Sequence, residues 1–133
     1  MSPVFLDTVG ILALLETADQ WHAEAARVWA ELASASRPLL TITLVFFECG
    51  NAVARKPYRS RVDEIRREFL AEGRLIRPTE EDIDQAWVAF ARGQAGHAGI
   101  VDHVSFQVMH RLVLTQAFTN DAHFRAAGFE TLF

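Results

Sequence analysis

The sequence predicts an α/β fold whose central, mostly parallel sheet of four to five strands is flanked by helices. Short apolar runs that suit buried strands alternate with longer segments whose apolar residues recur at helical spacing. Strands that alternate with helices favour a parallel sheet with helices packed on it. The length of 133 residues and the hydrophobic share of 50% suit one compact domain with a substantial core.

The first half of the chain predicts two strands and three helices. Residues 4–6 suit a short buried strand, and Thr8 can cap a helix over residues 9–15. A second helix is expected from about residue 21, because four apolar side chains recur at helical spacing: Trp21, Ala25, Val28 and Leu32. Residues 39–41 suit the next strand. The third helix follows over about residues 44–55, and Pro57 ends it.

The second half predicts four more helices and three strands. Residues 60–70 form a charged amphipathic pattern that Gly73 closes, and residues 75–77 suit a strand. Thr79 and Asp82 have the spacing of a capping box, and the helix they begin has three apolar residues on one face: Ile83, Trp87 and Phe90. After a loop over 93–99, Asp102 opens the next helix. A strand over 116–119, a short helix over 123–127 and a last strand over 129–132 complete the pattern.

Bulk composition excludes several classes of protein. A net charge of −4 provides no global basic field for nucleic acid, so a polyanionic substrate would need local contacts and metal ions. The single cysteine rules out an internal disulfide and, with no signal peptide before residue 3, suits a cytoplasmic protein. No apolar stretch approaches the length of a membrane span. No two histidines have metal-ligand spacing, so a zinc site is not expected.

Four acidic residues interrupt or end apolar stretches: Asp7, Glu48, Asp102 and Asp121. A carboxylate is rarely buried unless a partner offsets the cost of its desolvation. Ligands of α/β folds lie at the carboxyl ends of the strands, where Asp7 and Asp121 fall. A hard divalent cation, which takes oxygen ligands, is the simplest shared partner. This pattern predicts a metal-dependent enzyme acting on phosphate esters.

Each acid also has a structural interpretation. Asp7, Asp102 and Asp121 could each cap the helix that follows, whereas Glu48 lies inside a helix and could be neutralised by Arg55. Two carboxylates about 4 Å apart repel by roughly 4 kcal/mol at an effective dielectric constant near 20, so four in one pocket require a cation or shifted pKa values.

In their order along the chain, four motifs make the sequence resemble the PIN-domain ribonucleases and, within them, the VapC-like toxins of bacterial toxin–antitoxin pairs. VFLDTVGILALL contains Asp7 with Thr8 beside it, and ECGNAVAR contains Glu48 and Asn51. IVDHVSFQVM contains Asp102 and Ser105, and FTNDAHFRAAGF contains Asp121. The resemblance covers nearly the whole chain and implies a single PIN-like nuclease domain over residues 1–133.

The resemblance implies cleavage of RNA, with tRNA among the candidate substrates and Mg²⁺ or Mn²⁺ as cofactor. It makes Asp7, Glu48, Asp102 and Asp121 the catalytic and metal-binding residues. Thr8, Asn51 and Ser105 would then orient a carboxylate or a bound water. It further implies a homodimer and a cognate antitoxin that blocks the site.

The only local cluster of cations lies between residues 55 and 67. Five of its members are candidates for contact with RNA or with an acidic antitoxin: Arg55, Lys56, Arg59, Arg61 and Arg66. The alternative is a solvated helical hairpin with no ligand.

Two other classes of function compete with the ribonuclease. Another magnesium phosphohydrolase is the enzymatic rival, but a haloacid-dehalogenase-like phosphatase needs a second Asp where this chain has Val9, and a receiver domain needs a late lysine where the only lysine is Lys56. A non-catalytic PIN-like binding scaffold is the other alternative, and the presence of all four acids argues against it.

Overall fold

The computed structural model describes residues 2–133 and contains one sheet of five parallel strands in the order β3-β2-β1-β4-β5. The bounds of the strands are β1 Val4–Leu6, β2 Leu39–Ile42, β3 Leu75–Ile76, β4 Gln116–Phe118 and β5 Glu130–Thr131. The predicted α/β class with a parallel sheet is therefore confirmed, and all the pairings are parallel.

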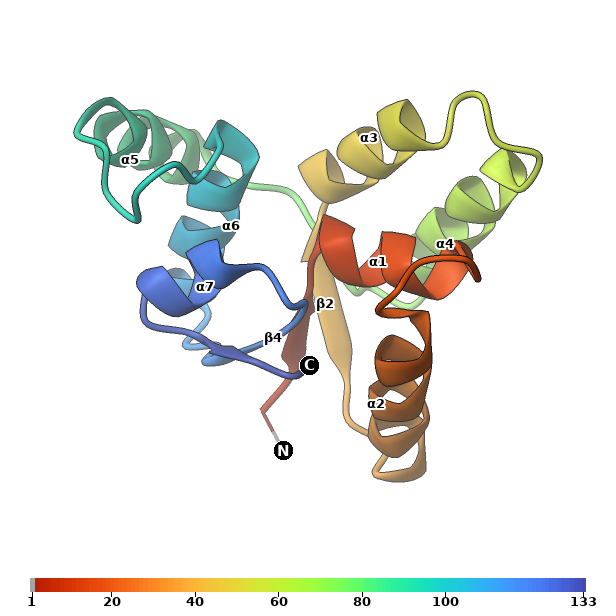
Figure 1. Cartoon of the computed structure of the whole chain (residues 1–133). Helices are drawn as coiled ribbons and strands as arrows, with labels where there is room; N and C mark the ends of the chain where they lie inside the picture. The colour runs from red at the N-terminus through yellow and green to blue at the C-terminus, as the bar shows by residue number, and fades with distance from the viewer. Residues whose placement is uncertain (1) are drawn as a thin grey trace.

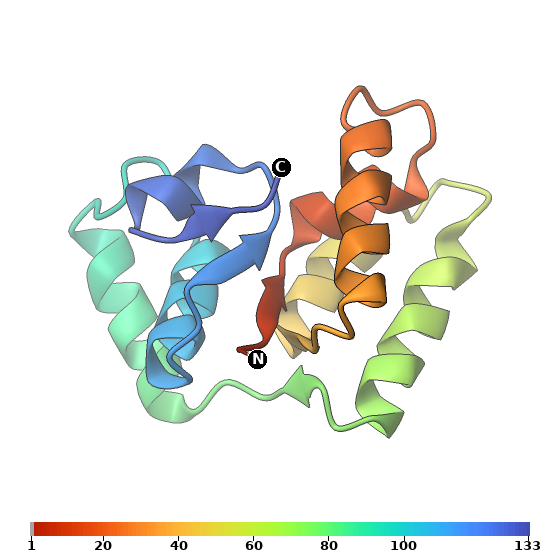
Figure 2. The ribbon, with the colours of Figure 1, turned by 90° about the horizontal axis from the view of Figure 1, so that it is seen from below.

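Within residues 2–133, seven helices cover the two faces of this sheet. On one side lie α1 Thr8–Leu15, α2 His22–Ser34, α3 Thr43–Ala52 and α4 Arg59–Ala71, and on the other lie α5 Glu80–Ala91, α6 Ile100–Arg111 and α7 Ala122–Ala126 (Figure 1). Figure 2 shows the same division from below, with the segment that contains β3 crossing between the two groups. Among residues 2–133, no helix combines the length and apolar character needed to cross a membrane.

The core lies on both faces of the central strand. All three residues of β1 are buried, as a parallel strand covered by helices requires. Phe118 of β4 and Phe124 of α7 are fully buried beside it, and the ring of Phe5 lies 6.2 Å from that of Phe124. Aromatic packing therefore fixes β4 and α7 against β1, at the point where two of the acidic residues leave the sheet.

Gly10 lets α1 approach β4 closely. A Cβ atom at this position would lie 2.2 Å from the carbonyl oxygen of Phe118 and 2.4 Å from its ring, far inside van der Waals contact. Only a residue without a side chain fits here. This close approach holds the first turn of α1 over the end of β4.

Several predicted helix boundaries differ from the structure. Asp7 rather than Thr8 caps α1, because the Asp7 side chain accepts a hydrogen bond from the Val9 N–H. The third helix ends at Ala52, so Arg55 lies beyond it and Pro57 is not the residue that ends it. The capping box of Thr79 and Asp82 is confirmed.

The predicted apolar face of α5 is wrong for two of its three residues, because only Ile83 packs against the core. Trp87 and Phe90 are 51% and 42% exposed, whereas Ala86 and Ala89 are buried. The helix has apolar residues all around it, and its small alanines allow a closer approach to the rest of the fold than the large aromatic side chains would. The aromatic face is consequently left on the surface.

A candidate metal centre at the carboxyl edge of the sheet

The acidic residues gather where the chain leaves β1 and β4. These neighbouring strands lie at the switch point of the topology, because β1 pairs with β2 on one side and with β4 on the other. Asp7 follows β1 directly, and Asp121 follows β4 after two residues. The layer of α1 and α3 and the layer of α6 and α7 face each other across this edge (Figure 1). Such crevices are the usual ligand sites of open α/β sheets.

Asp7 is the most deeply buried of the four acids, with 2% of its surface exposed. Its Oδ2 accepts hydrogen bonds from the hydroxyl of Thr119, at 2.8 Å, and from the Val9 N–H, at 3.4 Å. The Thr119 hydroxyl in turn accepts a hydrogen bond from the Asp121 N–H at 3.1 Å. Thr119, a residue that the sequence pattern alone does not single out, therefore links the first and fourth acids.

Two of the acids, Asp7 and Asp102, have raised pKa values. Burial first, and then the charges of Asp102 and Asp121, raise the pKa of Asp7 from its usual 3.8 to about 7. Burial first, and then repulsion from Asp121 and Glu48, raise the pKa of Asp102 to about 6. These effects place the four acids in one electrostatic environment. The neighbouring His123 lowers the pKa of Asp102, but among the described residues no lysine or arginine forms an ion pair with any of the four acids.

Glu48 joins this environment from α3. The hydroxyl of Thr8 donates a hydrogen bond to Glu48 Oε1 at 2.7 Å, linking the first turn of α1 to α3. The hydrogen-bond partner of Glu48 is thus Thr8, the neighbour of the first acid. The alternative in which Arg55 neutralises Glu48 is therefore wrong.

Asp102 and Asp121 lie next to a histidine that sequence spacing did not single out. Asp121 caps α7 by accepting a hydrogen bond from the His123 N–H at 2.9 Å. The Nδ1 of His123 is 2.9 Å from Asp121 Oδ1 and 3.9 Å from Asp102 Oδ2. One ligand atom from each of these three residues lies within 4.8 Å of the others. The spacing of the histidines does not indicate this group, because it contains one histidine and two aspartates.

Two further polar residues of the motifs do not hydrogen-bond the acids. The Ser105 hydroxyl donates to the Val101 carbonyl at 2.9 Å, the usual bond of a serine inside a helix to the preceding turn. Asn51 is exposed on α3. Between residues 2 and 133, the hydroxyls that bond the carboxylates of the site belong to Thr8 and Thr119.

The donor set fits a hard divalent cation. In hydrogen bonds between described residues, Glu48, Asp102 and Asp121 each engage one carboxylate oxygen, which leaves the second oxygen of each available. The engaged oxygen fixes the orientation of the side chain. The available oxygens are the ligands that Mg²⁺ and Mn²⁺ take.

Most cations of the basic segment already have partners. Arg61 pairs with Glu64 at 2.8 Å, and Arg66 with Asp63 at 2.7 Å. Lys56 lies 3.7 Å from Glu16, and Arg59 donates to the Ala54 carbonyl. The segment is therefore less positive than its sequence indicates, and Arg55 lies in the turn that precedes α4.

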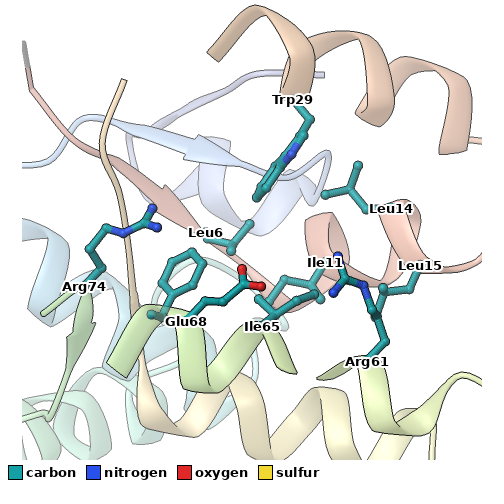
Figure 3. Close-up of a pocket in the computed structure, with 10 residues that line it drawn as sticks. Leu6, Ile11, Leu14, Leu15, Trp29, Arg61, Ile65, Glu68 and Arg74 are labelled. Atoms are coloured by element: carbon teal, nitrogen blue, oxygen red, sulfur yellow. The ribbon is translucent and has the colours of Figure 1, made fainter. Parts of the chain in front are cut away.

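A pocket of about 270 Å³ lies away from the acids, between α1, α2 and α4. Ile11 and Leu14 of α1 and Trp29 of α2 line it with apolar surface, while Arg61 and Glu68 project from α4 (Figure 3). The pocket is thus apolar inside and charged on the side of α4. It contains none of the four acids of the site.

Known proteins resemble the chain over nearly its whole length. The PIN domain family matches residues 4–130. The 23S rRNA-specific endonuclease VapC20 of Mycobacterium tuberculosis is 30% identical over 131 residues in both strains compared, CDC 1551 / Oshkosh and ATCC 25618 / H37Rv, and 95% of each chain is covered. The crystal structure of the same organism's VapC20, a sarcin-ricin loop cleaving toxin, has a TM-score of 0.81 at 28% identity, again over 95% of each chain.

Proposed function

Because the chain belongs to the PIN domain family, we propose that it is a Mg²⁺- or Mn²⁺-dependent endoribonuclease and the toxin of a toxin–antitoxin pair. It would act in the cytoplasm as a single nuclease domain over residues 1–133. The observation that carries the proposal is the group of four carboxylates at the sheet edge, two of which have pKa values of about 7 and about 6. A cation would relieve their repulsion.

The four acids would have two parts in the proposed reaction. Asp7, Glu48 and Asp102 would hold the cation, and Asp121 would lie at the margin of the site or serve a second ion. A bound divalent cation lowers the pKa of a coordinated water and offsets the charge that develops on the phosphoryl group. The hydroxyls of Thr8 and Thr119 keep the carboxylates of Glu48 and Asp7 in one orientation.

The proposed substrate is structured RNA. The relatives compared are named for cleavage of 23S rRNA and of its sarcin-ricin loop, which makes a ribosomal RNA loop the first candidate and tRNA the second. Mapping RNA fragments at nucleotide resolution after brief expression separates the two. A single cut in 23S rRNA would support the first, and cuts confined to tRNA would support the second.

The proposal also includes two protein partners. The aromatic face of α5, with Trp87 and Phe90 exposed, suits the interface of a homodimer, which analytical ultracentrifugation of Trp87→Ala tests. The pocket beside Arg61 suits an apolar side chain of an antitoxin segment that also has an acidic residue.

Changing Arg59, Arg61 and Arg66 to Ala distinguishes an RNA surface from an antitoxin surface. Loss of RNA binding with a flatter salt dependence would indicate phosphate contacts, each worth about 0.7 in the salt slope for single strands. Loss of the copurifying antitoxin alone would indicate a partner surface. If neither changes, the segment is a solvated hairpin, in agreement with its local ion pairs.

Replacing Asp7 or Asp102 with Asn tests the nuclease directly. Each variant should abolish RNA cleavage while the far-ultraviolet circular dichroism stays that of the parent. Asp84→Asn, at an exposed position of α5, is the matched control and should remain active. Full activity of either site variant would refute the assignment, and a wild-type protein without a tight Mn²⁺ site would favour the non-catalytic scaffold.

A further inference from the structure

We propose that His123 is a ligand of a cation that it shares with Asp102 and Asp121, and that its nitrogen makes the site prefer Mn²⁺ to Mg²⁺. The inference rests on the proposed function, because it concerns the same site. It goes beyond the four carboxylates by adding a fifth donor of a different chemical kind. The observation behind it is the close group formed by Asp102, Asp121 and His123.

The distances in this group suit one shared ion. Metal–ligand bonds of about 2.1 Å place neighbouring ligand atoms about 3 Å apart and opposite ones about 4.2 Å apart. The Nδ1 of His123 is 2.9 Å from Asp121 Oδ1 and 3.9 Å from Asp102 Oδ2, within this range. These two oxygens also accept backbone hydrogen bonds, so each would bind the cation through its remaining lone pair. A cation could therefore contact all three side chains without a rearrangement of the backbone.

Local structure fixes the position of His123. Asp121 caps the five-residue helix α7, so His123 lies in its first turn. The next residue, Phe124, is fully buried, and its ring lies 4.9 Å from that of Phe106 on α6. Because Phe124 is locked in the core, α7 cannot rotate, and its histidine is held beside the carboxylates on the open side of the site.

The imidazole is not needed to satisfy Asp121. The carboxylate oxygen nearest to Nδ1 already accepts a hydrogen bond from the His123 backbone N–H at 2.9 Å. The side chain is 37% exposed, so solvent or a cation can reach it. The imidazole of His123 is therefore not required for the helix cap and remains available to bind a cation.

The chemistry of the donors determines the preference. Carboxylate oxygens suit Mg²⁺ and Mn²⁺ alike, whereas an imidazole nitrogen favours transition-metal ions over Mg²⁺. A site made of carboxylates alone has little means to distinguish the two ions. Adding His123 should raise the affinity for Mn²⁺ and leave the affinity for Mg²⁺ almost unchanged.

Binding of each ion to RNA-free protein tests the inference. Isothermal titration should show that His123→Ala lowers Mn²⁺ affinity at least about tenfold and changes Mg²⁺ affinity by less than about twofold. Electron spin echo spectroscopy of the Mn²⁺ complex should detect coordinated ¹⁴N in the wild type and lose it in the variant. His110→Ala, which changes an exposed histidine at the other end of α6, is the control and should retain both signals.

The outcomes separate this inference from the proposed function. If wild-type protein binds both ions and His123→Ala changes neither affinity, the inference is overturned while the nuclease assignment stands. Equal losses for Mg²⁺ and Mn²⁺, without a ¹⁴N signal in the wild type, also overturn it and make His123 a positioning residue for Asp121. If wild-type protein binds neither ion, the proposed function itself fails. His123→Gln, which keeps a polar side chain, provides a second variant if the alanine protein does not fold.

Discussion

Asp7→Asn should stabilise the metal-free protein at alkaline pH. The carboxyl of Asp7 ionises with a pKa of about 7 in the folded protein against an ordinary 3.8, so its charged form opposes folding. The difference of about three pKa units corresponds to about 4 kcal/mol at pH 8 and about 2 kcal/mol at pH 5. Asn caps helices as well as Asp does and can accept the same hydrogen bonds from Val9 and Thr119.

Urea unfolding with a chelator present, at pH 8 and at pH 5, measures this gain. In thermal unfolding at pH 8, the same difference should raise the Tm by roughly 15 °C. Asp82→Asn is the matched control: Asp82 is also buried, but its hydrogen bonds from Arg111 hold its pKa below the usual value, so its replacement should destabilise. A destabilised Asp7→Asn protein at pH 8, or a gain independent of pH, would refute the reasoning.

Three further predictions follow from the same contacts. Metal-free wild-type protein should become more stable as the pH falls from 8 to about 5, because the raised pKa values of Asp7 and Asp102 make the folded state bind more protons than the unfolded state. Urea unfolding across this pH range, with and without Mn²⁺, measures the trend, and a trend that the ion does not change would contradict the prediction. Gly10→Ala should destabilise the folded protein by at least about 1–3 kcal/mol, because the added Cβ would clash with Phe118. Gly50→Ala on α3, where a Cβ meets open space, should stabilise the protein by about 0.5–1 kcal/mol. Similar unfolding midpoints for the two variants would argue against the close packing of Gly10 on Phe118. Thr119→Val should raise the pKa of Asp7 further, because it removes a hydrogen bond to the charged carboxylate. The carboxyl ¹³C resonance of Asp7 measures this pKa, and a lowered value would be inconsistent with that hydrogen bond.

The fold is largely predictable because its physical signals are local. Residues 4–6 are apolar without interruption, as a strand covered on both faces must be, and the structure buries all three. The capping box at Thr79 is equally local and is confirmed. The buried face of α5 is not predictable in this way, because Ala86 and Trp87 are both apolar and only the neighbouring elements determine which one faces inward.

The site is predictable in part, for the same reason. An acid that interrupts an apolar run stands out in the sequence, so Asp7 and Glu48 can be identified without a structure. Thr119 cannot, because its hydroxyl bonds a carboxylate 112 positions away and a threonine after a strand is common. His123 is missed because its significance depends on Asp102, which another helix brings within 3.9 Å.

Capping and metal binding are not competing interpretations of these acids. Asp7 caps α1 and Asp121 caps α7, so the structural interpretation of both residues holds. A helix cap uses one carboxylate oxygen and holds the side chain in a single orientation, which a metal ligand also needs. In Asp121, the oxygen bonded to the His123 N–H is fixed and the other stays available. The caps thereby hold together like charges that would otherwise move apart. A cation that binds at this edge of the sheet relieves the resulting repulsion, and its binding is favoured for that reason.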